Sequence, residues 1–172
     1  MKKIYILPLV LLLLLSYGCC DKDGEEDIIM PPETSIGANT FGCYVNDDLF
    51  VTPKMVPSLA REAYYSPGTG YLNIHSIDFK DRGIGFGAII ELGKTHGKIG
   101  MAGFRDGDNY FEKVDGCEGE VTLTKLDLEN MIISGRFSFQ ARQLDIYSGE
   151  DLDSTLTVCS GRFDLKLEPI NY

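Results

Sequence analysis

Side chains that could act as general bases or nucleophiles are few in this chain. It contains two histidines, His75 and His96, against 26 aspartates and glutamates. A Ser–His–Asp or Cys–His arrangement would need one of these histidines, yet neither has a nucleophile motif such as GxSxG nearby. Two carboxylates can hydrolyse a glycoside at a suitable distance, but so acidic a chain meets that condition trivially. The sequence therefore predicts no catalytic residue and no enzyme.

Metal and cofactor sites are not indicated either. The loops RDGDNYFE (105–112) and GEDLD (149–153) carry carboxylates at alternating positions, as in oxygen-rich calcium loops, but the EF-hand pattern is absent. GIGFG at 83–87 lacks both the GK[ST] tail and the following helix of a phosphate loop. We expect solvated turns at the two loops. At GIGFG we expect glycines packed on a sheet face, leaving room for an aromatic ring or another backbone.

Three cysteines follow residue 40: Cys43, Cys117 and Cys159. They contain no CxxC pair, so a zinc site is not predicted. In an oxidising compartment a pair could form a disulfide. We expect Cys117 and Cys159 to be that pair, because the last strand should return near the hairpin that Cys117 precedes. Three separate thiols are the alternative, and Cys43 is the next partner to consider.

Aromatic residues are the remaining candidates for ligand contact. Tyr64, Tyr65 and Tyr71 flank the turn SPGTG, and Tyr110 and Phe111 lie beside an acidic loop. Exposed aromatic rings stack on sugars in glycan-binding modules and are also enriched in protein interfaces. The first three tyrosines are therefore candidate stacking residues; the alternative is that they pack at the edge of a β core.

Alternating polarity predicts strands through most of residues 40–172. At 83–92 every second residue is apolar, which is typical of a half-buried strand. Residues 64–79 form a hairpin pattern whose apolar phase changes near His75–Ser76, where we expect a bulge.

A second hairpin pattern spans residues 120–140, and the last strand, LTVCSGRFDLKL, has Cys159 in phase with Phe163. The element SGRF occurs in both, and a glycine bulge that re-aims the strand explains it. No segment has a sustained helical period. The fold class is therefore all-β, an antiparallel β-sandwich with meander hairpins, with a lipocalin-like β-barrel as the alternative.

The first eighteen residues have the pattern of a secretory signal: Lys2 and Lys3, then an apolar run from Ile4 to Leu15. As a helix this run of twelve residues rises about 18 Å. A helix that crosses the bilayer core needs roughly 20 residues, or about 30 Å. The following LLSYGCC resembles the lipobox of bacterial lipoproteins, with Gly18 preceding the cysteine to be acylated.

The resemblance assigns the lipid to Cys19 and makes residues 1–18 a lipoprotein signal peptide. Ser16 stands where the family usually has leucine, which leaves Cys20 as the alternative site. Two acyl chains suffice for stable anchoring, so the membrane is a predicted partner through this lipid.

Residues 19–39 are expected to form an acidic, disordered tether to a single β domain at 40–172. The run DKDGEED (21–27) resembles the surface-export signal of Bacteroidota lipoproteins, which favours an outer-membrane protein exposed on the cell surface; a periplasm-facing protein is the alternative. A flexible coil of about 20 residues has a root-mean-square reach of roughly 25 Å.

Charge narrows the list of partners. The formal net charge is −10, and removal of Lys2 and Lys3 with the signal makes it −12. A strongly acidic body repels phosphate backbones, so nucleic acid is not an expected partner. The same sign disfavours adhesion of the domain surface to anionic lipid.

Three segments resemble an uncharacterised family of Bacteroidota lipoproteins: NTFGCYVN (39–46), TLTKLDLENMIISGRFSF (122–139) and SGRFDLKL (160–167). The resemblance covers most of residues 31–172. Members commonly begin the domain with NTFGC-VNG, and Asp47 stands here in place of that glycine. The family implies no known activity, substrate or catalytic residue.

The sequence thus predicts a surface or periplasmic lipoprotein whose β domain is a non-enzymatic binding or structural module. Its expected partner is a glycan or an envelope protein. A carbohydrate-binding accessory lipoprotein of a glycan-uptake system is the alternative. A hydrolase is a third, less favoured function, since it would require a concave pocket that holds two titratable side chains with shifted pKa values.

Overall fold

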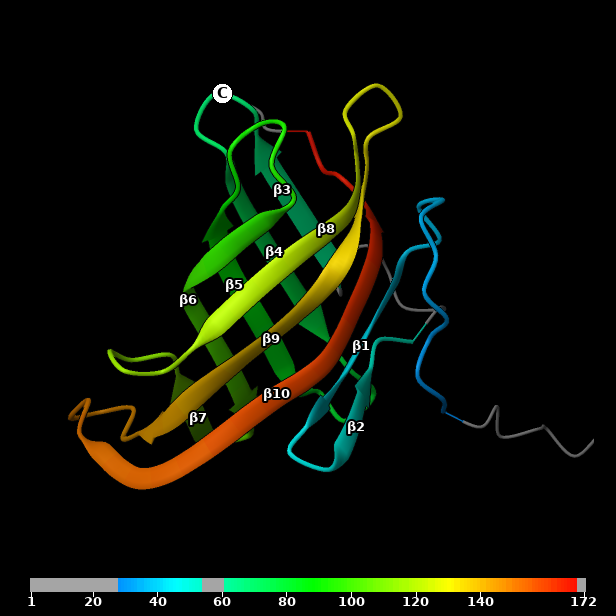
Figure 1. The fold of residues 1–172 in the computed structure, drawn as a ribbon. Helices are drawn as coiled ribbons and strands as arrows, with labels where there is room; N and C mark the ends of the chain where they lie inside the picture. Colours follow the sequence, from blue (N-terminus) through cyan, green and yellow to red (C-terminus); the bar gives the residue numbers. More distant parts are fainter. Residues whose placement is uncertain (1–27, 54–60, 170–172) are drawn as a thin grey trace, which may run out of the picture.

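The computed structural model describes residues 28–53 and 61–169, which form ten antiparallel strands and no helix (Figure 1). The strands are β1 (Thr40–Val45), β2 (Asp48–Val51), β3 (Arg61–Ser66), β4 (Tyr71–Ile77), β5 (Gly83–Ile89), β6 (His96–Asp106), β7 (Asn109–Glu112), β8 (Gly119–Asp127), β9 (Ile132–Leu144) and β10 (Asp151–Lys166).

All ten strands belong to one sheet, in the order β2-β1-β10-β9-β7-β6-β5-β4-β3, and β8 also pairs with β6 and β9. The sheet folds over on itself, so that β8, β9 and β10 cross in front of β3 to β6 (Figure 1). Two layers face each other as in a β-sandwich, which confirms the predicted all-β class with meander hairpins. Glu168 N donates to the Ala63 carbonyl (2.8 Å) and ties the chain after β10 to β3 at the other end of the order.

Phenylalanine rings from both layers meet in the core between them. The Phe86 and Phe137 centroids are 4.7 Å apart, and those of Phe41 and Phe137 are 5.1 Å apart. The alternation predicted at 83–92 is confirmed from Ile84 to Ile90. It is wrong at Leu92, which is 65% exposed because β5 has already ended.

The hairpin at 64–79 is confirmed, but the bulge expected near His75–Ser76 is wrong. β4 pairs with β3 and β5 in continuous register from Tyr71 to Ser76. The inward phase continues through Ser76, which is fully buried and hydrogen-bonded to the hydroxyl of Thr52. Ser76 is thus a hydrogen-bonded polar residue at an inward position. In the sequence it interrupts the apolar alternation, and this interruption resembles a change of the buried face.

The two SGRF elements, at 134–137 and 160–163, pair with each other; we call this pairing the seam. Phe163 lies opposite Gly135, and Phe137 opposite Gly161. The register shifts in β10 between Val158 and Gly161, so the expected bulge occurs at the second copy.

Because of that bulge, the prediction that Cys159 faces inward in phase with Phe163 is wrong. Ser160 has a φ of 53°, and the register shift around it re-aims the strand. Before the bulge, Leu156 and Val158 are the buried residues, whereas after it Phe163 and Leu165 are. Cys159 is only half-buried and lines an outer hollow instead of facing the core.

The segment before β1 belongs to the folded domain from about Met30, which corrects the disordered tether expected through residue 39. Asp164 of β10 is 1% exposed and accepts five hydrogen bonds, four of them from this segment. The five donors are the hydroxyls of Thr34 (2.6 Å) and Ser134 (2.7 Å) and the backbone N–H groups of Gly37 (2.8 Å), Ile36 and Ala38 (3.1 Å each). A buried carboxylate needs such partners, and four of the five here lie more than 100 residues away in sequence. The predicted signal peptide and the start of the tether, residues 1–27, lie outside the described residues.

Candidate functional site

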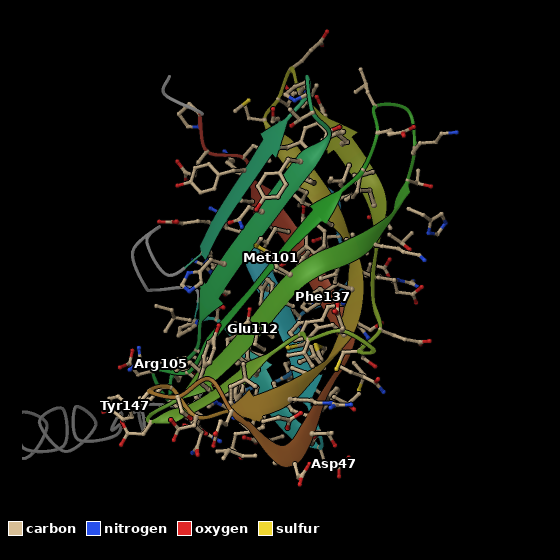
Figure 2. The ribbon with its side chains drawn as sticks, turned by 90° about the vertical axis from the view of Figure 1, so that its left-hand side faces the viewer. Asp47, Met101, Arg105, Glu112, Phe137 and Tyr147 are labelled. Atoms are coloured by element: carbon tan, nitrogen blue, oxygen red, sulfur yellow. The ribbon has the colours of Figure 1, made fainter. Side chains whose placement is uncertain are left out.

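The outer face of β4, β5 and β6 carries three glycines in neighbouring positions. Gly85 pairs with Gly103 across β5 and β6, and Gly83 pairs with Arg105 one step further along. On the β4 side His75 lies opposite Gly85. Figure 2 shows this side of the molecule, with Met101, Glu112 and Arg105 following one another down it.

These glycines form the floor of an open hollow of about 510 Å³, which we call the trough. It is lined by His75, Ile77, Asp81, Gly83, Ile84, Gly85, Gly103, Phe104, Arg105, Gly107 and Tyr110. Ile84 and Phe104 point into the core, so the floor itself is backbone. Pockets with such a mixture of apolar surface and a few polar groups are typical ligand sites.

Packing does not require glycine at the floor. A Cβ at Gly85 would lie 3.4 Å from the Ile74 carbonyl oxygen, and one at Gly103 would lie 3.4 Å from that of Phe111. At Gly83 the nearest atom would be 3.8 Å away, and none of the three has a positive φ. Gly87 differs, because its Cβ would lie 2.9 Å from the Tyr71 hydroxyl and 3.0 Å from Met101. The packed glycine predicted for GIGFG is thus found at Gly87 but not at Gly83 or Gly85.

Aromatic and apolar side chains stand at both ends of this face. At one end Tyr71 pairs with Ile89, and its hydroxyl lies 3.9 Å from Met101 Sδ. These three side chains are 37%, 64% and 57% exposed, respectively. At the other end Tyr110 pairs with Arg105 and with Leu144, after which the loop carries the almost fully exposed Tyr147 (Figure 2).

The three candidate stacking tyrosines divide between the core and the surface. Tyr65 is wrong as a stacking residue, because it is 5% exposed and its hydroxyl donates to the Ile90 carbonyl (3.0 Å). Tyr64 and Tyr71 take the outward phase of β3 and β4, where Tyr64 pairs with Asn73. Burial raises the pKa of Tyr64, and nearby Glu62 adds to the effect.

Charged groups gather at the polar end of the trough. Arg105 donates from Nε to the Gly107 carbonyl (3.1 Å), and within the described residues it makes no salt bridge. The Tyr110 hydroxyl lies 3.5 Å from Glu112, and its pKa is raised by burial and by that carboxylate. The guanidinium of Arg105 is thus available to an incoming polar group, while Tyr110 stays protonated and can donate a hydrogen bond.

A larger hollow of about 750 Å³ lies on the outer face of β8, β9 and β10. Its charged lining mixes two lysines with two glutamates, and Phe139 at its floor is 2% exposed with its ring in the core. It offers no exposed aromatic face among its lining residues. The trough is therefore the better candidate for recognising a ligand.

The predicted Cys117–Cys159 disulfide is not formed: both are free thiols, although both line the larger hollow. Cys117 precedes β8 and Cys159 lies in β10, so β9 runs between them. That strand separates them, whereas the Cα atoms of bridged cysteines lie within about 7 Å of each other. Cys43 is buried and free, and burial raises the pKa of its thiol.

The residues considered for metal or acid–base chemistry are dispersed. Within the described part of the chain, no three His, Cys, Asp or Glu side chains gather where they could hold a metal ion. Asp106 and Asp108 flank the β6–β7 turn, where their neighbour Gly107 has a φ of 57°. His96 Nδ1 lies 2.8 Å from the Thr122 hydroxyl, on the far side of β6 from His75.

No family model, curated protein or solved structure matches the chain. Within residues 28–53 and 61–169, no helix has the length and apolar character needed to cross a membrane. Cys19 and Cys20, the predicted lipid sites, lie outside the described residues. The trough is therefore the feature of the described residues from which a function can be inferred. Sequence alone missed its floor, because which glycines are free of packing depends on neighbours from other strands.

Proposed function

We propose that this chain is an exported lipoprotein of the cell envelope, that its β domain is a non-enzymatic binding module, and that the trough is its binding face. The glycine floor carries the proposal. Gly85 and Gly103 each have room for a Cβ and no positive φ, so the sheet does not require glycine there. Glycine inside a strand costs roughly 0.5–1 kcal/mol relative to alanine. Bare backbone lets a ligand approach the sheet closely, which accounts for that cost.

A glycan is the ligand that the trough's side chains favour over an envelope protein. Tyr110 and Arg105 line the trough, and Tyr71 and the Asn73 amide lie further along the same outer face, beside Gly87. Aromatic rings supply apolar faces for sugar rings, and planar polar groups fix hydroxyls in place. The chain would then be a carbohydrate-binding accessory lipoprotein of a glycan-uptake system.

A hydrolase is not favoured by the same residues. Among the described residues that line the trough there is no serine, threonine or cysteine beside His75. A covalent mechanism of the Ser–His or Cys–His type would have no nucleophile in this position. Binding without turnover is the simpler use of these groups.

Glycan-array binding by the folded domain tests the proposal. We expect wild-type protein to bind a defined set of oligosaccharides, and the double variant Gly85→Ala/Gly103→Ala to lose most of that binding. The matched control is Gly68→Ala, since a Cβ at this turn glycine meets nothing within 4 Å and φ there is not positive. Equal binding by wild type and double variant would overturn the trough as the binding face. Absence of glycan binding would shift the ligand class to an envelope protein.

Anchoring is tested separately on whole cells. The variant Cys19→Ala should lose acyl labelling and appear in the soluble fraction; retained labelling would move the site to Cys20. Removal of the acidic run 21–27 should reduce digestion of the protein by protease added to intact cells. Equal digestion with and without the run would mean that it serves only as a spacer.

A further inference from the structure

The seam brings two arginines face to face. Arg136 of β9 pairs directly with Arg162 of β10, one residue from each glycine of the seam. Like charges directly opposite on neighbouring strands destabilise a sheet. The chain carries only 16 lysines and arginines against 26 acidic residues, so two cations at one position require an explanation.

A carboxylate from the segment before β1 binds one of these arginines. Glu33 accepts two hydrogen bonds from Arg136, from Nε (2.9 Å) and Nη2 (2.6 Å). The hydrogen bond with Arg136 lowers the pKa of Glu33, and the charges of Arg136 and Arg162 lower it further. Arg162 donates one hydrogen bond from Nη1, to the Pro31 carbonyl (3.3 Å). A guanidinium has five N–H donors, so Arg162 keeps donors to spare.

An open hollow of about 490 Å³ adjoins the pair. Besides the two arginines it is lined by Glu33, Glu120, Thr122, Phe137, Ser138, Ser160 and Gly161. Two guanidiniums and three hydroxyls are the donors that bind phosphate and sulfate, since the planar fork of arginine fits their oxygens two at a time. Besides Glu33, Glu120 is a lining carboxylate that opposes such an anion.

We propose that Arg136 and Arg162 form a binding site for a phosphate or sulfate group, and that Glu33 is a built-in occupant which such a group displaces. The Glu33–Arg136 ion pair is exposed, with 35% and 65% of the two side chains accessible, so it is weak enough to be exchanged. The site lies on the opposite layer from the trough, and it depends neither on the lipid anchor nor on the binding function proposed above.

Calorimetric titration with sodium phosphate and sodium sulfate at fixed ionic strength tests the site. We expect Glu33→Gln to bind these ions about tenfold more tightly than wild type, because the competing charge is gone. Adding Arg136→Gln to that variant should abolish the binding. The matched control is Asp151→Asn, which removes the partner of another exposed arginine, Arg142, on the same two strands. It should bind as wild type does. Equal affinity in wild type and Glu33→Gln would overturn the proposal, as would an equal response to chloride.

The source of the oxyanion is distinguished with vesicles of phosphatidylcholine containing phosphatidic acid. Sedimentation of Glu33→Gln with these vesicles, lost on adding Arg136→Gln, would assign the site to a lipid headgroup. Binding of the free ions without vesicle binding would assign it to a soluble phosphate or sulfate. Both outcomes support the site, and failure of both overturns it.

Discussion

The seam and the trough are both lined with glycine, for opposite reasons. At the seam a Cβ on Gly161 would lie 2.5 Å from the Phe137 ring, and one on Gly135 would lie 2.5 Å from the Thr122 carbonyl oxygen. In the trough the corresponding distances at Gly85 and Gly103 are 3.4 Å. Glycine at the seam is therefore required by packing, whereas glycine in the trough is not. The comparison separates residues that hold the fold from residues that leave a surface open.

The largest effect is expected when a methyl group is forced into the seam. Gly161→Ala should lower the free energy of unfolding by about 3 kcal/mol, since the new Cβ meets both the ring and the carbonyl oxygen of Phe137. Urea denaturation of wild type and variant measures the difference. A loss smaller than about 0.5 kcal/mol would mean that β10 moves aside without strain, and the contrast with the trough would then fail.

The buried carboxylate beside the seam should have the next largest effect. Asp164→Asn keeps the size of the side chain but turns an amide group toward the donors that now surround a carboxylate. We expect a loss of about 2 kcal/mol at pH 7, as for a hydrogen-bonded charged group. Far-ultraviolet circular dichroism should show the same sheet, because four of the five lost donors lie in the segment before β1 and the backbone pairing of β10 is unchanged.

The stabilisation from Asp164 should also depend on pH. Burial alone would raise the pKa of Asp164, but hydrogen bonds from Thr34, Ser134, Ala38 and Gly37 outweigh it and lower the pKa. A carboxyl whose pKa is lowered by folding stabilises the protein above its unfolded pKa of about 3.9. The contribution is lost as pH falls through the folded value. The difference between wild type and Asp164→Asn should therefore be full at pH 6 and shrink below pH 4; a difference that grows on acidification would contradict the assignment.

The strands and the repeated seam element could be predicted from the sequence, while long-range neighbours could not. Period-two patterns located β5 and both hairpins because each pattern is local. The apparent slip at Ser76 and the phase of Cys159 were misread, because the first depends on a hydroxyl partner in another segment and the second on a bulge. The Asp164 contacts and the trough floor combine residues from distant strands, for which one sequence carries no signal.

Tyr65 and Tyr71 allow the same comparison between a packed and an exposed position, with a smaller expected effect on stability. Tyr65→Phe removes a buried hydroxyl that donates to the Ile90 carbonyl, so we expect a loss of about 1 kcal/mol. Tyr71→Phe removes an exposed hydroxyl on the same outer face as the trough and should change stability by less than about 0.5 kcal/mol. The effects of the two variants on ligand affinity should have the opposite order: Tyr71→Phe should bind the ligand more weakly than Tyr65→Phe does. Equal losses of stability would contradict the assignment of Tyr71 to the binding face.

The smallest effect on stability, and the one that most sharpens the comparison, is expected in the trough itself. Gly85→Ala and Gly103→Ala should leave the free energy of unfolding unchanged or raise it by up to about 1 kcal/mol, because alanine restricts the unfolded chain and its Cβ finds ordinary contact distances. Urea denaturation measures this beside Gly161→Ala under identical conditions. If alanine at these positions raises stability, the native glycines lower it. Binding of a ligand on the open floor would explain why glycine is present there. Destabilisation of both variants by more than about 1 kcal/mol would instead mean that packing requires these glycines, and the argument for a binding face would lose its basis.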